Sequence, residues 1–369
     1  MSIVLNTVPE FEGEWEEERL ADIADLYKGT GISKDQLSDD GEPCILYGEL
    51  YTKYKSETIR EVISKTNIDN TKLVRSKAND VIIPCSGETA EDIATARCVL
   101  NGNILLGGDL NIIRLHGYDG AFMSYQLNGR RKYDIAKVAQ GVSVVHLYGE
   151  HLKGVKTINP CLEEQKKIAK LLSLLDERIS TQSKVIDKLQ SLIRGIAHKI
   201  SKQGKPNIRL SECLECSSTT LQESDVAEVG AYPVYGANGI VGYLDTYSTT
   251  KEAIYIIKDG SGVGSVSYVK GKCSATGTLN ILEAKEGYSL RYLYFMLKVF
   301  NFEPYKTGMA IPHIYFKDYR KAKIYCPSYE LQVKYTDLLF GIEQKAITEQ
   351  KILTNLYNQK QYLLRQMFI

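Results

Sequence analysis

The 369-residue sequence lacks the features that mark membrane, exported and strongly charged proteins. It has no apolar run of about 18 residues, and its first twenty residues have neither a basic start nor an apolar core. We therefore expect a cytoplasmic protein with no membrane association. Positive and negative charges nearly balance: the sequence has 46 Lys and Arg and 45 Asp and Glu, which gives a net charge of +1. This balance does not by itself indicate a nucleic-acid-binding protein.

Motifs of catalysis and metal binding are missing too. The sequence has no GxxxxGK[ST] phosphate loop, no HExxH, no GxSxG and no NPP[YF] tetrapeptide of amino-methyltransferases. The eight cysteines suggest no disulfide framework, and Cys213 and Cys216 have no second pair at zinc-site spacing, so we expect no metal. The glycine-rich GSGVG at 260–264 lacks GxGxxG spacing and favours a hairpin. These absences indicate a binding protein.

What the sequence does contain is an internal repeat. Residues 141–200 align without a gap with residues 308–367, at an offset of 167 positions. The matched pairs include Gly141 with Gly308, His146 with His313, Tyr148 with Tyr315, Pro160 with Pro327, Gln165 with Gln332, and Leu172 with Leu339. Solenoid repeats are much shorter, about 20–50 residues, so the chain holds two copies of a domain plus helix. We expect head domains at 1–157 and 206–323, and helical regions at 158–205 and 324–369.

Each copy contains a long amphipathic helix that follows a proline. Apolar residues recur at alternating spacings of four and three, which is a heptad seam. In the first copy the seam is Ile168, Leu172, Leu175, Ile179, Ile186, Leu189, Ile193, Ile196 and Ile200, with Gln182 as a polar position. In the second it is Tyr335, Leu339, Ile342, Ala346, Leu353, Leu356, Leu363 and Met367, with Glu349 and Lys360 as polar positions. The two helices are predicted to pair as an antiparallel intramolecular coiled coil, although one helix alone would be read as ordinary core packing.

The head regions read as mixed α and β structure. Short β-like runs cut by Gly, Asn and Asp occur at 80–87, 105–115, 232–247, 252–271 and 275–284, and a helix-like run follows at 290–300. The predicted fold class is α+β, with two pseudo-symmetric α/β heads separated and followed by long helices. The matched histidines beside apolar residues are interpreted as structural residues that anchor each head to its helix.

This layout resembles the specificity subunits of type I restriction-modification systems. The motif reads PCLEEQKKIAKLLSLLDERI at 160–179 and PSYELQVKYTDLLFGIEQKA at 327–346. WEEERLADIADLYKGTG at 15–31 and NIRLSECLECSSTTLQ at 207–222 resemble the start of the two target-recognition domains of that family. The segments YPVYGANGIVGY and GMAIPHIYF resemble sequences that are typical of the second target-recognition domain of this family. The resemblance covers nearly the whole chain, and Tyr335 and Lys360 depart from the usual apolar seam.

The resemblance implies a non-catalytic subunit without a cofactor of its own. Each head would read one half of a bipartite, asymmetric site in double-stranded DNA, and the helices would set the unread spacer. Two methyltransferase (modification) subunits that use S-adenosylmethionine would dock on the chain and methylate adenine N6. Two motor-nuclease (restriction) subunits that use ATP and Mg²⁺ would complete the complex. A seam of 33 residues at about 1.5 Å per residue spans roughly 50 Å, more than the about 34–36 Å of one DNA turn.

Two other interpretations remain open. One is the specificity subunit of a related system whose nuclease and methyltransferase are fused on one partner chain. The other is a coiled-coil scaffold whose two heads bind protein or carbohydrate and have no DNA role.

Candidate DNA contacts are sorted by chemistry, because phosphate contacts position a protein and base contacts specify sequence. Acidic residues crowd into 10–61 of the first head and basic ones come later, so one side of it is expected to be basic, or else its surface is evenly mixed. The phosphate candidates are Lys72, Arg75, Lys77, Lys132, Lys258, Lys270, Lys272 and Lys306. Arg130 and Arg131 suit either phosphate or guanine, and Tyr51, Tyr54, Tyr235 and Asn238 in polar loops suit bases. For any one of these residues the alternative is a solvated surface role.

Overall fold

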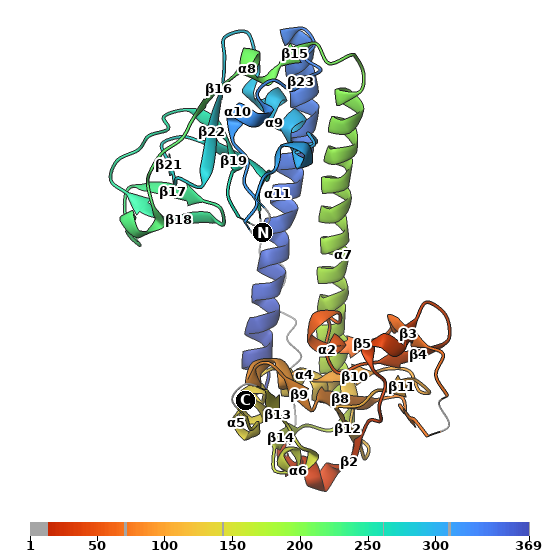
Figure 1. Cartoon of the computed structure of the whole chain (residues 1–369). Coiled ribbons are helices and arrows are strands. Elements are labelled where there is room, and N and C mark those ends of the chain that lie inside the picture. Colours follow the sequence, from red (N-terminus) through yellow and green to blue (C-terminus); the bar gives the residue numbers. More distant parts are fainter. Residues whose placement is uncertain (1–13, 70–71, 142–143, 261, 309–310, 369) are drawn as a thin grey trace. The chain divides into compact units, whose positions relative to one another are not determined.

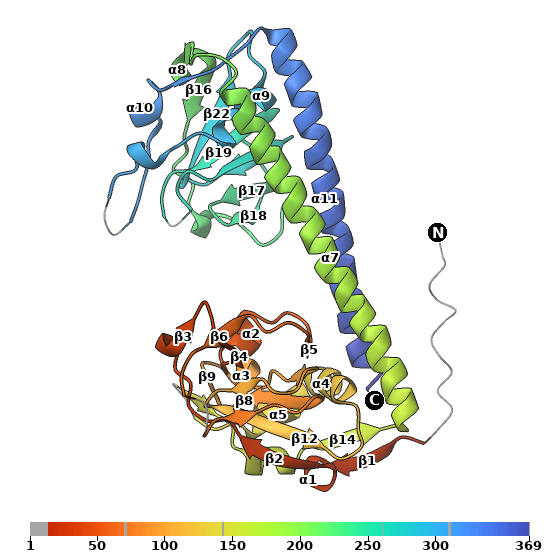
Figure 2. The ribbon, with the colours of Figure 1, turned by 90° about the vertical axis from the view of Figure 1, so that its right-hand side faces the viewer.

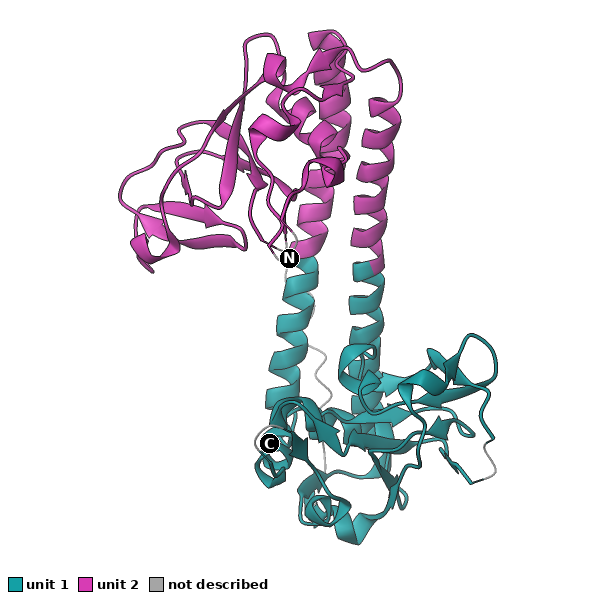
Figure 3. Cartoon of the chain, viewed as in Figure 1, with its two compact units in different colours: residues 1–183, 352–369 teal, residues 184–351 magenta. Residues whose placement is uncertain are grey.

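The computed structural model describes residues 14–69, 72–141, 144–260, 262–308 and 311–368 (Figure 1). The first thirteen residues, Ser261 of GSGVG, and Met309 and Ala310 of GMAIPHIYF lie outside the described residues. The chain forms two compact units (Figure 3): unit 1 comprises 1–183 and 352–369, and unit 2 comprises 184–351. Each unit therefore contains one head and half of each long helix. The four boundaries expected from the sequence stay a prediction, because the units are divided within the helices.

The two long helices are α7, Leu162–Ser201, and α11, Tyr329–Gln366. Both begin two residues after a proline, as the sequence predicts. In unit 1, Ile168 and Leu172 of α7 pack in one cluster with Leu364 of α11, so the start of one helix meets the end of the other. In unit 2, Ile200 packs in one cluster with Leu339. The predicted antiparallel pairing is confirmed in each unit, and Figure 2 shows the two helices side by side from a second direction.

The predicted seam is the buried face of both helices. The fully buried seam residues are Ile168, Leu172, Ile179, Ile186, Ile193, Ile200, Leu339, Ala346, Leu353 and Leu356. The half-buried ones are Leu175, Leu189, Ile196, Tyr335, Ile342, Leu363 and Met367. Lys360 is also buried, at 5% exposure. Among the described residues, no helix combines the length and apolarity needed to cross a lipid bilayer.

The head of unit 1 is built around two five-stranded sheets. The first has the order β2 (Ala24–Lys28), β12 (Leu110–Leu115), β8 (Asp80–Pro84), β10 (Arg97–Val99) and β5 (Thr58–Ile59). It is antiparallel except between β10 and β5. The second has the order β3 (Leu37–Ser38), β6 (Ser64–Thr66), β4 (Glu42–Ile45), β11 (Leu105–Leu106) and β7 (Val74–Arg75). Two further pairs are β1 (Glu16–Arg19) with β14 (Lys156–Asn159), and β9 (Ser86–Gly87) with β13 (Val145–His146).

Apolar residues cover both faces of the central strand β8. Val81 and Ile83 belong to a core with Met123 and Leu127 of helix α4 (Gly120–Asn128), whereas Ile82 belongs to a second core on the opposite face. This follows from the period of two in a strand, and it explains why the three consecutive residues Val81 to Ile83 are all apolar. The remaining helices are α1 (Leu20–Ile23), α2 (Glu49–Thr52), α3 (Ala90–Ile93), α5 (Lys132–Val138), α6 (Gly149–Lys153) and the 3-10 turn Lys34–Gln36.

The head of unit 2 repeats the first sheet of unit 1 with one strand fewer. Its order is β16 (Leu214–Ser217), β22 (Leu279–Ala284), β19 (Glu252–Ile257) and β20 (Val266–Lys270), all antiparallel. A three-stranded sheet has the order β18 (Gly239–Leu244), β17 (Tyr232–Gly236) and β21 (Ser274–Ala275). β15 (Ile208–Arg209) pairs with β23 (Lys323–Ile324). The helices are α8 (Leu210–Cys213), α9 (Leu290–Lys298), α10 (Phe316–Tyr319) and the 3-10 turns Glu223–Asp225 and Glu303–Tyr305.

The two heads are thus pseudo-symmetric in their main sheet and its helix. β2-β12-β8-β10 of unit 1 corresponds to β16-β22-β19-β20 of unit 2, and α4 corresponds to α9. Unit 1 adds β5 beside β10, whereas in the described part of unit 2 the sheet ends at β20. The hairpin predicted at GSGVG is present, because this segment lies between the paired strands β19 and β20. β17 and β18 form a further hairpin that turns at 237–238.

Candidate functional site

The base of each head is attached to its long helix by the same glutamine. In unit 1, the N–H of Asp119 donates to Gln165 Oε1 at 2.9 Å, and Gln165 Nε2 donates to the carbonyl of Pro160 at 2.8 Å. In unit 2, Gln332 makes the same bonds to the N–H of Ser289 at 2.9 Å and to the carbonyl of the matched proline at 2.9 Å. Asp119 and Ser289 are the N-cap residues of α4 and α9. The glutamine of the repeated motif therefore satisfies a helix-end N–H and ties head to helix.

A second shared contact joins an acid of the long helix to a tyrosine of the head. Tyr125 on α4 donates to Asp176 Oδ2 at 2.8 Å, and Tyr294 on α9 donates to Glu343 Oε1 at 2.7 Å. Asp176 and Glu343 are matched by the repeat. Burial raises the pKa of both tyrosine hydroxyls, so they remain donors to the carboxylates.

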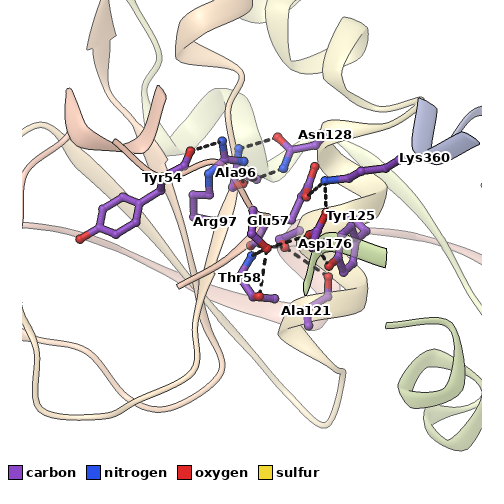
Figure 4. A network of polar contacts seen from close by, with 12 residues as sticks. Tyr54, Glu57, Thr58, Ala96, Arg97, Ala121, Tyr125, Asn128, Asp176 and Lys360 are labelled. Carbon is purple, nitrogen blue, oxygen red and sulfur yellow. Dashed lines mark hydrogen bonds and ion pairs between the residues drawn. The ribbon is translucent and has the colours of Figure 1, made fainter. Parts of the chain in front are cut away.

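The lysine that completes this junction comes from a different element in each unit. In unit 1, Lys360 of α11 contacts Glu57 Oε2 and lies 2.6 Å from Asp176 Oδ1, and Ser56 Oγ donates to Asp176 Oδ2 at 2.7 Å (Figure 4). In unit 2, Lys298 of the head lies 3.2 Å from its acid, and the position matched to Lys360 is the apolar Ile193. The lysine that interrupts the predicted seam is therefore the cation of a buried cluster.

The cluster in unit 1 contains two cations and two acids that are nearly closed to solvent. The side chains of Lys360, Glu57 and Asp176 are 7%, 9% and 8% exposed. Arg97 is also buried and donates to three backbone carbonyls at 3.0–3.1 Å. Burial lowers the pKa of Arg97, while Glu57 and Asp176 act to raise it. Burial raises the pKa of Glu57, although Lys360 opposes that rise. Each charged group in the network has a partner of opposite charge or a hydrogen bond. Removal of one residue would therefore leave a buried charge without its partner.

The basic residues expected on one side of the first head do not come together. Lys72, Arg75 and Lys77 lie in and around β7, whereas Arg130 to Lys132 join α4 to α5. Figure 1 shows α5 and β11, the neighbour of β7, on opposite sides of unit 1. The two groups lie on different elements at different sides of unit 1, which agrees with the alternative of a mixed surface.

The arginines of this set differ in how available they are. Arg75 Nη1 lies 2.6 Å from Glu42 Oε2, and that contact raises the pKa of the guanidinium. The side chain of Arg131 is only 14% exposed and lies 3.4 Å from Asp134 Oδ2. Arg130 is exposed. Arg130 is thus more accessible than Arg131 for contact with a base edge.

None of the three tyrosines predicted to lie in polar loops is in an exposed loop. Tyr54 is 7% exposed, belongs to the core beneath the first sheet, and accepts a hydrogen bond from the N–H of Ile63. Burial raises its pKa to about 12. Tyr235 lies within β17 and packs edge-on against Tyr255. Tyr51 is half-buried in α2. The expected placement of Tyr54 is wrong because its ring, in an apparently polar segment, covers the core.

In the second head the predicted residues lie in several loops. Asn238 is exposed in the turn between β17 and β18, as predicted. Lys272 is exposed and lies 4.8 Å from the ring centre of Tyr247. Lys258 is half-buried after β19, Lys270 pairs with Glu252 at 3.7 Å, and Lys306 pairs with Glu303 at 2.6 Å. Exposure favours Asn238 and Lys272 as surface contacts.

Cys213 of the CxxC pair is buried and Cys216 is half-buried. Cys213 and Cys216 are free cysteines, and burial raises their pKa to about 12 and about 11. A thiol with such a pKa stays protonated and is a poor ligand. No group of three or more His, Cys, Asp or Glu with metal-site geometry occurs in the part of the chain that the structure describes.

Comparison with known proteins settles the family. A model of the type I restriction modification DNA specificity domain matches residues 12–191 and, a second time, residues 206–358. The chain belongs to this family. The two matches correspond to the two heads with their following helices, so the repeat seen in the sequence is the duplication of the specificity domain.

Relatives and a solved structure agree with this assignment. A putative type I specificity subunit of Mycoplasma genitalium is 26% identical over 285 residues, 70% of this chain and 73% of that protein. The EcoprrI specificity subunit of Escherichia coli is 29% identical over 120 residues, and the match spans 30% of its length. The crystal structure of a type I restriction-modification S subunit from M. genitalium has a TM-score of 0.68 at 21% identity and covers 100% of this chain and 98% of that one. The specificity-subunit fold is therefore shared.

Sequence reasoning did not identify the residues that hold the specificity domains to the helices. Gln165 and Gln332 occupy matched positions of the repeat. A glutamine that recurs at the same position of both copies is the signal that could have identified this role. Asp176 and Glu343 were visible as a matched acid. Nothing in the sequence marks Glu57 as the partner of Lys360, because 303 positions separate them.

Proposed function

We propose that this chain is the DNA-binding specificity subunit of a type I restriction-modification complex. Each head would read one half of a bipartite, asymmetric site, and the paired helices would set the spacer between the halves. The chain would bind no cofactor, and S-adenosylmethionine, ATP and Mg²⁺ would act in partner subunits. The observation that carries this proposal is that the two specificity domains share their attachment to the helices but differ in their exposed residues.

The outer face of the helices supports docking of methyltransferase subunits. Apolar residues that lie one position before the seam are exposed on both helices, by 36% to 55%. They are Leu171, Leu174, Val185 and Leu192 on α7, and Leu338 and Ile352 on α11. Two pairs of this stripe, Leu171 with Leu338 and Val185 with Ile352, occupy repeat-matched positions, so two copies of one partner could dock on similar surfaces. The shared stripe suits a shared partner, and the divergent heads suit two different half-sites.

Mapping methylated adenines tests the proposal directly. The chain is expressed with the methyltransferase encoded beside it in cells without other adenine methylation, and the methylated positions are read from the genomic DNA. We expect one motif with two half-sites and a fixed spacer. Absence of methylation, together with no salt-sensitive binding of the complex to duplex DNA, would favour the scaffold interpretation.

The spacer role has its own test. Removal of one heptad from α7 and the facing heptad from α11 is expected to shorten the spacer or abolish methylation, while both half-sites stay recognisable in any sites that are still modified. An unchanged spacer in an active variant would contradict the role of the helices as a ruler.

A further inference from the structure

A cavity of about 560 Å³ lies in unit 2, between the two helices and the base of the head. Its apolar walls include Ile186 and Ile193 of α7, Val266 at the start of β20, and Ala346 of α11. Its charged walls are Arg194, Lys298 and Glu343. The space therefore has the mixed lining of a site for a protein side chain, with apolar walls and a few polar groups.

The repeat shows what fills the corresponding space in unit 1. Ile193 is matched to Lys360, and Glu343 is matched to Asp176, so the cavity lies where unit 1 has its buried charged cluster. There the space is taken by Ser56 and Glu57, which precede β5. Unit 2 has no strand that corresponds to β5 in the part of its sheet that is described. Among the described residues of unit 2, the segment that fills the junction in unit 1 therefore has no counterpart.

The charges of the two junctions differ by one carboxylate. In unit 1, Lys360 and Arg97 face Glu57 and Asp176, which balances two cations with two acids. In unit 2, Lys298 and Arg194 line the cavity with Glu343 as the acid among the lining residues. Glu343 already accepts from Tyr294 and Lys298. Arg194 is exposed, and its contact with Ser191 Oγ, at 3.3 Å, is to a neutral group. The missing member is an acid.

We propose that this cavity receives an acidic side chain from a segment of the methyltransferase subunit that docks on unit 2. This inference rests on the proposed function and names a contact within it. The carboxylate pairs with Arg194, and the rest of the segment packs on Ile193 and Val266. The apolar walls favour a protein segment over a DNA phosphate, whose partners are basic and polar groups. The two docked methyltransferases are then held unequally.

A charge reversal with a matched control tests this contact. Arg194→Glu reverses the charge beside the cavity, and Gln361→Glu introduces the same acid at the repeat-matched exposed position of unit 1, where the wild-type residue is neutral. Binding of the purified methyltransferase to the full-length chain is measured by titration calorimetry. We expect Arg194→Glu to weaken one of two binding steps by at least about tenfold, and Gln361→Glu to leave both unchanged. Equal isotherms for the two variants overturn the proposal.

A photo-crosslinker identifies the occupant. p-Benzoylphenylalanine replaces Gln190 at the cavity, and Tyr357 at the matched position of unit 1 in the control. We expect the first to capture a methyltransferase peptide that contains Asp or Glu, and the second not to capture that peptide. Capture of DNA or of a second copy of this chain at Gln190 overturns the proposal. If the unaltered chain binds no methyltransferase at all, the proposed function fails instead, so the two failures are distinguishable.

Discussion

The junction between head and helices uses matched positions in both units, but its chemistry differs. Both units use the glutamine of the repeated motif and a tyrosine bound to an acid of the long helix. In unit 1 the head inserts Glu57 between the helices and Lys360 neutralises it, whereas unit 2 keeps Ile193 and leaves a cavity. The two copies of the domain thus share a frame, but one junction is charged and filled and the other contains a cavity. The following predictions test this difference, from the largest expected effect to the smallest.

Loss of the buried cation should affect unit 1 most. Lys360→Met leaves Glu57 and Asp176 in the core without their cation, and we expect the free energy of unfolding to fall by about 3–5 kcal/mol. Ile193→Met at the matched position of unit 2 should cost less than about 1.5 kcal/mol. Urea denaturation, followed by a probe in each head, measures both. If the two substitutions lower the free energy of unfolding equally, the charged cluster does not make the junction of unit 1 different from that of unit 2.

The shared glutamine should matter equally in both units. Gln165→Ala and Gln332→Ala each remove two hydrogen bonds at a position that is 1% or 2% exposed. We expect each to cost about 2–3 kcal/mol, because a buried N–H and a buried carbonyl lose their partners. Thermal unfolding of the two variants and of Gln359→Ala, an exposed control, gives the comparison. A large difference between the two buried glutamines would argue against a common frame.

The charged junction should also make unit 1 sensitive to pH. The pKa of Glu57 is raised above its ordinary 4.5 by burial, so the folded state holds that proton more strongly than the unfolded state. Protonation of Glu57 therefore stabilises the folded state. This stabilisation is fully present below pH 4.5, the pKa of the unfolded state, and is lost as the pH rises through the higher pKa of the folded state. Without Lys360 the rise is larger, so Lys360→Met should recover part of its lost stability on acidification. The double variant with Glu57→Gln should lack this recovery in denaturation curves between pH 5 and about 8.

Surface cations should have the smallest effect on stability but one specific to each half-site. Arg75→Ala in unit 1 and Lys272→Ala in unit 2 should each change the free energy of unfolding by less than about 1 kcal/mol. If these residues contact phosphate, each should reduce the slope of log affinity against log salt concentration by about one, without changing the methylated motif. Binding of the complex to its site at several salt concentrations measures this slope. An unchanged slope would show that the substituted residue does not contact a DNA phosphate.

Periodicity predicted the long elements well, and local composition predicted the small ones less well. The heptad seam located both helices because burial recurs every three to four residues over 38 or 40 positions. The second sheet of unit 1 has strands of two to four residues, too short for a period of two to be visible, so Tyr51 and Tyr54, between β4 and β6, were assigned to polar loops. Tyr54 was misplaced for this reason.

Long-range partners were beyond the reach of the sequence. Lys360 looked like a defect in the seam because its helix alone offers it no acid, and Glu57 belongs to a segment near the other end of the chain. The repeat did carry usable information at Gln165 and Asp176, since both are matched in the second copy. Of the candidate DNA contacts, Asn238 could be placed in its turn from local residues, whereas the separation of Arg75 from Arg130 depends on the order of strands in two sheets.

The division of the chain into units also orders events during synthesis. Unit 2 is continuous in sequence, from 184 to 351, whereas unit 1 needs residues 352–369 in addition to the first 183. As the ribosome proceeds, the second head acquires all its residues while the first still lacks the stretch that carries Lys360, Leu364 and Phe368. Until the final turns of α11 emerge, Glu57 and Asp176 have no lysine, and the apolar start of α7 has no cover. The part of the protein that is translated first is thus the last to be completed.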